Sequence, residues 1–403
     1  MTVSGALRGV LDGVVVLDLT QVLAGPYCTM LLADHGADVI KIEPPGGDVA
    51  RTLGLYFDND RARRHGGYFH SVNRNKRSMV LDLKRPADSA VFRQLARQAD
   101  VVVENYRVGV MERLGLSYES LRADSPRLVY AAVRGFGDPR TGHSPYAEWP
   151  AFDIVAQAMS GFMSITGPGT PMKAGPGVGD IVPGLMCAFG VVAAVRHAER
   201  TGVGQFLDVA MYDALLSICE RLVHQHAVTG IVPRPTGNDH PLVSPFSIYP
   251  ARDGWVAIAC PLEAQWQQLA TLIGRDDLGR DPGLQTNADR VRAGTVIRDA
   301  ITAWTSVRRK REIAAQLGGR VPTGPVNDVT DIFADPHVAA RAMIAEIDIA
   351  ELGRTMQIAG VPVHFSATPG AVRSAGPDLG AHTAEVLRQF GVDALALTSG
   401  AAT

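Results

Sequence analysis

The amino-acid sequence predicts an α/β fold, and three observations support this prediction. Short β-branched runs alternate with helix patterns through the first half of the chain. The runs are apolar throughout, as is typical of strands that are buried on both faces of a parallel sheet. From about residue 237 the pattern changes to a hairpin that is followed by helices. We therefore expect a large domain with a doubly wound parallel sheet and a smaller α+β domain.

The first βαβ unit of the expected sheet lies near the start of the chain. Gly13–Leu19 is typical of a buried strand, Tyr27–His35 of a helix, and Asp38–Glu43 of the next strand. The turn after the first strand, Thr20–Pro26, lacks the G-x-G-x-x-G pattern with which dinucleotide-binding folds hold a pyrophosphate. We therefore expect a Rossmann-like domain without the dinucleotide fingerprint, and we exclude NAD(P) as a cofactor.

The alternation continues along the rest of this domain. We expect strands at residues 78–83, 100–105, 128–133 and 205–211, and helices at residues 87–99, 108–114 and 183–200. Lys76, Arg77, Lys84, Arg107 and Arg113 lie near the ends of these elements. Because ligands of open α/β sheets bind beyond the carboxyl ends of the strands, these cations are candidates for phosphate binding. The alternative is a basic surface in contact with water.

The composition limits the class of protein. The chain has 403 residues, of which 46% are hydrophobic and 20% charged, and its formal net charge is −2. This charge gives no electrostatic reason to expect binding to nucleic acid or to an anionic membrane. The four cysteines are far apart in the sequence, which argues against a zinc site and a disulfide framework. The N-terminus has no signal-peptide pattern, and the longest apolar run is shorter than the roughly 18–20 residues of a membrane span. We therefore expect a soluble cytoplasmic protein.

One carboxylate stands out within a glycine-rich stretch. Residues Gly175–Gly184 contain Asp180 among glycines and apolar residues, just before a long helix pattern. Glycine allows a ligand to approach the main chain closely, and a carboxylate with little water around it is suited to nucleophilic catalysis. Free main-chain N–H groups nearby would stabilise an oxyanion. The alternative is that Asp180 merely caps the helix that follows, since aspartate is a favoured N-cap residue.

Seven segments resemble family III CoA-transferases (the CaiB/BaiF family) and occur in the same order along nearly the whole chain. They are Val16–Pro26, His35–Pro44, Asn73–Ser78, Asp100–Tyr106, Gly179–Asp180, Thr201–Met211 and Ala367–Gly380. This family includes formyl-CoA transferase and the α-methylacyl-CoA racemases. The resemblance implies an enzyme that moves CoA from an acyl-CoA donor to a carboxylic acid acceptor. It also implies an interlocked homodimer with no permanently bound cofactor and no metal.

The resemblance assigns roles to particular residues. It implies that Asp180 is the catalytic nucleophile, which forms first an acyl-aspartyl anhydride and then an aspartyl-CoA thioester. The positions that match CoA-binding residues of the family are Ala24, Leu81, Lys84, Asn105, Tyr106 and Arg113. Of these, Lys84 and Arg113 are expected to contact the phosphates or the adenosine. Arg107, Lys76 and Arg77 are weaker candidates.

Two other functions remain as alternatives to CoA transfer. The racemases of the family carry a His-Asp pair, and this chain has Phe152-Asp153 at the matching position. Phenylalanine cannot exchange a proton, so one of the two bases is lost and a transferase is favoured over a racemase or another acyl-CoA isomerase. Asp153 keeps a carboxylate near the nucleophile, or else it is only a helix N-cap. The further alternative is a non-catalytic acyl-CoA-binding protein.

The expected substrate pocket differs from that of formyl-CoA transferases. Those enzymes place Gln where this chain has Leu23, and Trp where it has Leu53. They also use a polyglycine loop where this chain has Thr236–Pro245. Leucine supplies no hydrogen-bond donor for oxalate, which favours a larger or more apolar acyl group, such as a branched or dicarboxylic one. Together with Asp153 and Gly179, these leucines form the predicted substrate pocket.

The second half of the chain suggests the domain boundaries. We expect a large CoA-binding domain at residues 1–213, a linker helix at 214–236, a small domain at 237–335 and a segment at 336–403 that returns to the large domain. One long helix is expected over Tyr212–Thr229, and a hairpin over Pro245–Cys260 around Asp253-Gly254. Further helices are expected at residues 263–273, 291–305, 309–317 and 383–390.

Overall fold

The computed structural model describes residues 9–392, which form two compact units. Unit 1 contains the described residues up to Phe162, then Ala174–Val223, and those from His337 onward. Unit 2 contains Met163–Lys173 and His224–Pro336. The chain therefore passes from unit 1 into unit 2 twice and returns each time. The four-part division expected from the sequence remains a prediction.

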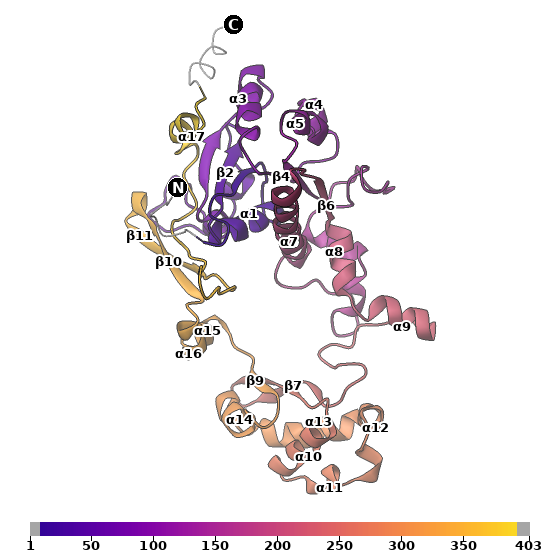
Figure 1. Cartoon of the computed structure of the whole chain (residues 1–403). Helices are drawn as coiled ribbons and strands as arrows, with labels where there is room; N and C mark the ends of the chain where they lie inside the picture. Colours follow the sequence, from indigo (N-terminus) through magenta and orange to yellow (C-terminus); the bar gives the residue numbers. More distant parts are fainter. Residues whose placement is uncertain (1–8, 393–403) are drawn as a thin grey trace. The chain divides into compact units, whose positions relative to one another are not determined.

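Unit 1 is built around a six-stranded sheet in which all neighbouring strands are parallel (Figure 1). The strands are β1 (Val15–Asp18), β2 (Asp38–Glu43), β3 (Arg77–Val80), β4 (Val101–Glu104), β5 (Val129–Arg134) and β6 (Phe206–Ala210). Their order is β3-β2-β1-β4-β5-β6, so the direction of winding reverses between β1 and β4. This is the order of a doubly wound fold, in which ligands bind at the point of reversal. The predicted α/β class is confirmed.

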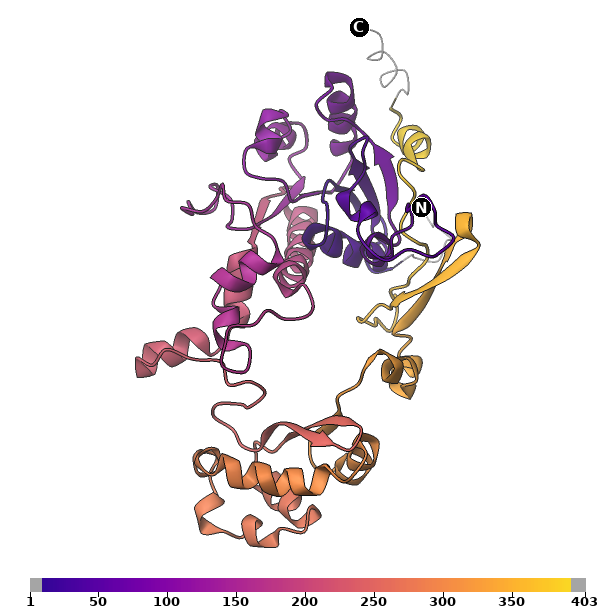
Figure 2. The same ribbon diagram turned by 180° about the vertical axis from the view of Figure 1, so that it is seen from behind.

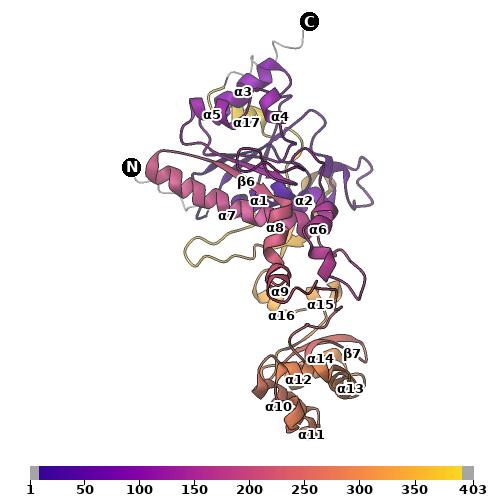
Figure 3. The same cartoon turned by 90° about the vertical axis from the view of Figure 1, so that its right-hand side faces the viewer.

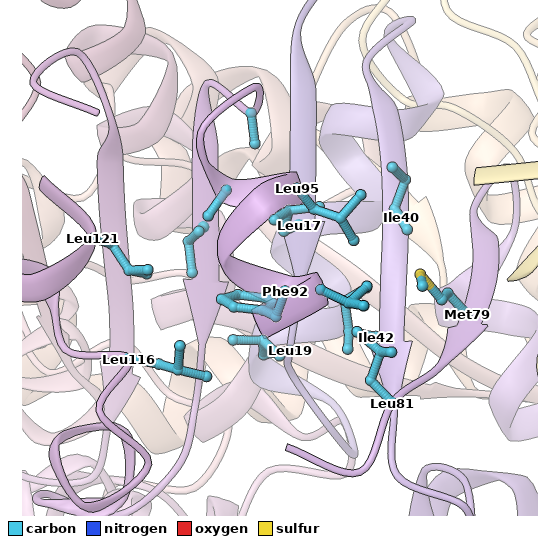
Figure 4. Close-up of a cluster of buried hydrophobic side chains, with 14 of the residues drawn as sticks. Leu17, Leu19, Ile40, Ile42, Met79, Leu81, Phe92, Leu95, Leu116 and Leu121 are labelled. Carbon is cyan, nitrogen blue, oxygen red and sulfur yellow. The ribbon is translucent and has the colours of Figure 1, made fainter. Parts of the chain in front are cut away.

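Helices cover both faces of this sheet. The elements that follow or precede its strands are α1 (Ala24–Asp34), α2 (Gly67–Asn73), α3 (Pro86–Ala96), α4 (Val110–Arg113), α5 (Tyr118–Asp124), α6 (Asp153–Met159), α7 (Val178–Thr201) and α8 (Met211–Ile218). On one face, Phe92 and Leu95 of α3 pack over Leu17 and Ile42 (Figure 4). On the other face, α1 and α7 pack over the alternate strand residues, such as Val16. Each strand therefore buries both of its faces, as its apolar sequence predicts.

Helix α7 is the long helix seen along its length in Figure 3. Within residues 9–392 it is the one helix that is long and apolar enough to cross a membrane. Its side chains at Cys187, Val191 and Ala194 are almost fully buried in the core against α1 and the sheet. We therefore assign α7 to the core of unit 1. It begins five residues before the expected start at Pro183, because Gly177 caps it and accepts the N–H groups of Asp180 and Ile181.

The returning segment lies beside the edge of the sheet that β3 forms (Figure 2). It contains the antiparallel strands β10 (Ile344–Ile349) and β11 (Arg354–Ala359), and the helix α17 (Thr383–Gln389), which lies beside β3. The buried guanidinium of Arg74 binds the carboxylate of Asp34 and the main-chain oxygen of Ala359. These contacts join the returning segment to α1.

A histidine also holds this segment. His65 places Nε2 3.1 Å from Glu351 and Nδ1 3.8 Å from Asp378. The contact with Glu351 is within hydrogen-bonding distance, whereas the one with Asp378 is longer, and the two carboxylates face different ring nitrogens.

Unit 2 combines a small antiparallel sheet with helices. Its strands are β7 (Phe246–Ala251), β8 (Gly254–Ala259) and β9 (Thr323–Pro325), in the order β7-β8-β9. Its helices include α10 (Glu263–Leu272), α11 (Asp276–Gly279), α12 (Asn287–Arg292), α13 (Gly294–Thr305), α14 (Lys310–Leu317) and α15 (Val329–Phe333). The predicted hairpin is confirmed, with Ala251 paired to Gly254 across a two-residue turn. Trp266, Ile297 and Ile313 are fully buried in its core.

The single helix expected over Tyr212–Thr229 is wrong. The structure has α8 and a separate helix α9 (Leu222–Thr229). The break lies at Cys219, whose ψ of 60° is not helical and whose main-chain oxygen accepts the N–H of Leu222 in a turn. The side chain of Cys219 is buried, so tertiary packing stabilises a bend that the helical pattern does not reveal.

The contact between α1 and α7 gives a test of the packing. A Cβ atom at Gly184 would lie 2.5 Å from the main-chain oxygen of Ala24, whereas one at Gly190 on the same helix would meet only the side chain of Leu207. We predict that Gly184→Ala lowers the free energy of unfolding by about 1–3 kcal/mol, because neither backbone can move aside easily. Gly190→Ala should cost less, since a leucine side chain can rotate. Urea denaturation of both variants measures the difference, and equal losses would contradict this packing.

Candidate active site

A pocket of about 260 Å³ lies in unit 1 at the carboxyl ends of β1 and β4. It is formed by the loops that follow these two strands, by the start of α7 and by the segment before α6. The lining residues are Gln21, Val22, Leu23, Ala24, Asn105, Tyr106, Arg107, Val108, Val133, Arg134, Gly135, Ala147, Trp149, Pro150, Ala151, Phe152, Asp180 and Met211. The pocket is therefore at the reversal of the sheet, where a doubly wound fold binds its ligand.

Asp180 lies in the first turn of α7 and is partly buried. Its N-cap residue is Gly177, so the alternative that Asp180 is itself the cap is wrong. Burial, with the nearby charge of Asp153 as the second cause, raises the pKa of Asp180 to about 7. Near neutral pH this carboxylate is accordingly a stronger base and nucleophile than a solvated one.

Asp153 begins α6 and faces the start of α7. Its Oδ1 accepts the N–H of Gly179 at 2.7 Å, and Gln157 donates to both of its oxygens at 2.8 and 2.9 Å. The N-cap of α6 is Phe152, so Asp153 is not simply a helix cap. A Cβ atom at position 179 would lie 2.5 Å from the main-chain oxygen of Asp153. Glycine is therefore required beside Asp180 for α6 and α7 to come this close.

The glycine-rich main chain around Asp180 does not supply the free N–H groups that the sequence suggests. Val178 donates to Pro176, Gly179 to Asp153, and Asp180 to Gly177. This expectation is wrong because the stretch is folded into the first turn of a helix. The N-terminus of α1 is the better source of free donors, since the first N–H groups of a helix have no partner within it. Ala24, the first residue of α1, lines the pocket.

Two hydrogen bonds to Asn105 hold the loop after β1. The main-chain N–H and oxygen of Gln21 bind the amide of Asn105 at 2.9 and 2.8 Å. Asn105 lines the pocket and also holds the loop in place, while its predicted contact with CoA stays a prediction. Glu104, the last residue of β4, accepts the main-chain N–H of Tyr106 at 2.7 Å and binds the buried guanidinium of Arg134. Arg134 also donates to the main-chain oxygen of Tyr106 at 3.1 Å. Burial raises the pKa of Glu104 to about 7 against the opposing charge of Arg134.

Some of the other predicted site residues line the pocket and some lie outside it. Leu23, Ala24, Asn105, Tyr106 and Arg107 line the pocket with Asp180. Asp153 and Gly179 lie beside Asp180 but outside the lining. Also outside it are Leu81, which is buried in the core of unit 1, and Leu53, Lys84 and Arg113, which are exposed. Arg77 pairs with Asp38 and Glu385. Lys76 is buried and binds Asp18, which keeps its ammonium group from the surface.

Tyr68 is a functional candidate that the sequence does not reveal. It lies on α2, which has no strong pattern in the sequence. Burial and then the charges of Asp180, Asp48 and Asp153 raise the pKa of Tyr68 to about 12. Its phenol therefore stays protonated at neutral pH and is within the electrostatic reach of Asp180. Arg134 and Glu104 are likewise missed, because a buried ion pair has no local signature.

Comparison with known proteins supports the family resemblance. The family model described as CoA-transferase family III matches residues 11–383. The chain is similar to the succinyl-CoA:mesaconate CoA-transferase of Haloarcula marismortui, with 45% identity over 96% of this chain and 97% of that protein. It is also similar to the succinate–glutarate CoA-transferase of Agrobacterium fabrum, with 39% identity over 94% and 95% of the two chains. A solved structure of a CaiB/BaiF family protein from Brucella suis has a TM-score of 0.83 and 34% identity over 95% of this chain and 99% of that one.

The raised pKa of Asp180 can be tested without any substrate. In protein labelled with ¹³C at its aspartate carboxyl carbons, one NMR signal should titrate near pH 7 and be absent from Asp180→Asn. In Asp153→Asn, which keeps an oxygen for Gly179, this signal should titrate at lower pH, because a like charge is removed. Burial remains, so the pKa should still exceed that of a solvated aspartate. A signal that titrates near pH 4 in the unaltered protein would contradict the assignment.

Proposed function

The chain belongs to CoA-transferase family III, and we propose that Asp180 carries CoA between an acyl-CoA thioester and a free carboxylic acid. The observation that supports this role most strongly is a partly buried carboxylate with a pKa near 7 in the wall of the pocket. Such a group is ionised often enough to attack, and it is poorly enough solvated to be reactive. The relatives described above are named CoA-transferases, which agrees with transfer rather than racemisation.

The proposed reaction proceeds in four exchanges. The Asp180 carboxylate attacks the donor thioester, and the C–S bond breaks to give an acyl-aspartyl anhydride and CoA thiolate. The thiolate attacks the aspartyl carbonyl, releasing the donor as a carboxylate and leaving an aspartyl-CoA thioester. The acceptor carboxylate attacks this thioester to form a second anhydride and CoA thiolate. The thiolate then attacks the acceptor's carbonyl, which releases the new acyl-CoA and restores Asp180.

Each exchange places negative charge on a carbonyl oxygen. We assign the stabilisation of this charge to the N-terminus of α1, where Ala24 lines the pocket. Free N–H groups and the positive end of the helix dipole both favour an anion there. Phe152 and Trp149 line the same pocket and would keep water from the anhydride.

The acyl donor and acceptor are proposed to be short dicarboxylic acids. The names of the two relatives specify succinyl-CoA, mesaconate, succinate and glutarate, all dicarboxylates or their CoA esters. Leu23 offers the pocket an apolar wall for the carbon chain, and the exposed Arg107 offers a cation for the distal carboxylate or for CoA. The pantetheine arm would pass Asn105 and Tyr106, with Lys84 and Arg113 as candidates for the phosphates.

We also propose that the active form is the interlocked homodimer of the family. Apolar side chains at Leu185, Phe189 and Val192 are exposed along one side of α7, with Phe189 at 79%. A face of this kind is unusual on a monomer and fits burial against a second copy. All four cysteines are buried and unpaired, which fits the reducing cytoplasm expected from the sequence.

Trapping of the intermediate tests the role of Asp180. Incubation with succinyl-CoA followed by hydroxylamine should place a hydroxamate on Asp180, detectable by peptide mass spectrometry. Asp180→Asn should lose at least about a thousandfold in turnover, equivalent to roughly 4 kcal/mol of barrier, because the nucleophile is removed. Binding of CoA to this variant, measured by calorimetry, should change little. Unchanged turnover in Asp180→Asn would rule the mechanism out.

Paired donors test the substrate class. Succinyl-CoA and butyryl-CoA have acyl chains of the same length and differ in whether the chain ends in a carboxylate or a methyl group. We predict that succinyl-CoA forms the adduct at least about tenfold faster, since a distal charge paired with a cation contributes more than about 1 kcal/mol. Stopped-flow or quenched-flow rates of CoA release measure this ratio. Equal rates, or a preference for butyryl-CoA, would contradict the dicarboxylate proposal.

A further inference from the structure

Val22 has a backbone conformation that valine rarely adopts. Its φ is 68°, in the left-handed region. For a β-branched residue this conformation is a true outlier and is strained. Val22 lies in the wall of the pocket, immediately before Leu23 and Ala24. Other contacts must therefore compensate for strain at the residue that leads into α1.

One carboxylate holds the strained residue directly. The Oδ1 atom of Asp48 accepts the main-chain N–H of Val22 at 3.1 Å. The other oxygen of Asp48 lies 2.9 Å from the ammonium group of Lys41, and both side chains are fully buried. Lys41 in turn donates to the main-chain oxygen of Thr20 at 2.7 Å. A single buried ion pair thus binds the main chain on both sides of Gln21.

Asp48 can affect the reaction through the main chain at Val22. Val22 is followed by Leu23 and Ala24, which form the N-terminus of α1 and line the same pocket as Asp180. This N-terminus lies close to the start of α7, since a Cβ atom at Gly177 would be 3.1 Å from the side chain of Leu23. If Val22 moved to a negative φ, the path of Leu23 and Ala24 relative to Asp180 would change. A shift of about 1 Å in catalytic geometry can cost roughly a hundredfold in rate.

We propose that Asp48 is a positioning residue that keeps Val22 in the left-handed conformation and thereby aims the N-terminus of α1 at Asp180. The proposal rests on the function proposed above for Asp180. Asp48 itself does not line the pocket and is not a catalytic residue. Its position outside the seven segments that match the family explains why the sequence does not indicate this role.

A purely structural role must be distinguished from this one. Asp48 also accepts the N–H of Ala50 at 2.9 Å, and its own N–H donates to Glu43 at 3.1 Å. Loss of Asp48 would therefore destabilise the turn after β2 as well. Substitution of Val22 by glycine separates the two effects, because glycine adopts a positive φ without a steric penalty and has no effect on the turn at Ala50.

The test compares Asp48→Asn, Val22→Gly and the double variant in rates of adduct formation on Asp180 from succinyl-CoA. In Asp48→Asn one oxygen replaces two, and the charged Lys41 attracts it most strongly, so the amide N–H₂ group faces the N–H of Val22. We therefore expect Asp48→Asn to be about 10- to 100-fold slower, with the KM for succinyl-CoA within about threefold of normal, because geometry rather than binding is lost. Val22→Gly changes a residue of the pocket wall, so its rate is the reference for the double variant. The double variant should recover at least about tenfold over Asp48→Asn, since a glycine at this position needs no carboxylate to hold its positive φ. A double variant as slow as Asp48→Asn, or a normal rate in Asp48→Asn, would overturn the proposal.

A matched control uses Asp34, another fully buried carboxylate, which ends α1 and pairs with Arg74. Asp34→Asn should not be rescued by Val22→Gly.

Crystal structures of Asp48→Asn supply a readout that needs no activity, since φ of Val22 should leave the positive region. Failure to form an adduct in the unaltered protein would refute the function of Asp180, whereas an unmoved Val22 would refute the role of Asp48. Should Asp48→Asn not fold, Lys41→Gln removes the counter-ion of Asp48 and should show the same rescue.

Discussion

The site depends on a group of buried ions beneath the loop that follows β1. Asp18, Lys41, Asp48 and Lys76 are almost completely shielded from water and are paired with one another. Buried charges are tolerated only when each is paired and hydrogen-bonded, so this group permits few arrangements. Its remaining contacts reach the main chain, since Lys41 binds the oxygen of Thr20 in the loop and Lys76 binds that of Pro26 in the first turn of α1. These two contacts fix the start of the loop and the N-terminus of α1.

Three carboxylates of unit 1 show how the surroundings determine their chemistry. Burial by itself would raise the pKa of Asp18, but Lys76, Lys41 and two hydroxyl groups hold it below the ordinary value. Asp18 is thus a permanent anion with a structural task. For Asp180, burial and then the charge of Asp153 raise the pKa to about 7. Glu104 is raised to a similar value although Arg134 pairs with it, and it does not line the pocket. Of the three, only Asp180 combines a raised pKa with access to a ligand.

The sequence predicts much of this fold because its strands and hairpin carry local patterns. Apolar β-branched runs indicate the parallel strands, and Asp253-Gly254 indicates the turn between β7 and β8. Asp180 can be found in the same way, since Gly179 beside it reflects the close approach of α6 and α7. What the sequence cannot supply is set by tertiary contacts: the break at Cys219, the early start of α7, and the engagement of the N–H groups around Asp180. Arg134 lines the pocket, Tyr68 lies within the electrostatic reach of Asp180, and Asp48 binds the main chain of Val22, and no local motif marks any of the three.

The most direct test of CoA transfer through Asp180 follows oxygen atoms. In the proposed reaction the acceptor carboxylate leaves one of its two oxygens on the aspartyl carboxyl group when its anhydride is cleaved at the acceptor's carbonyl. Turnover of succinyl-CoA with an acceptor labelled with ¹⁸O in both carboxyl oxygens, followed by peptide mass spectrometry, should therefore place ¹⁸O in Asp180. Rapid formation of the new acyl-CoA without ¹⁸O in the Asp180 peptide would contradict the covalent route.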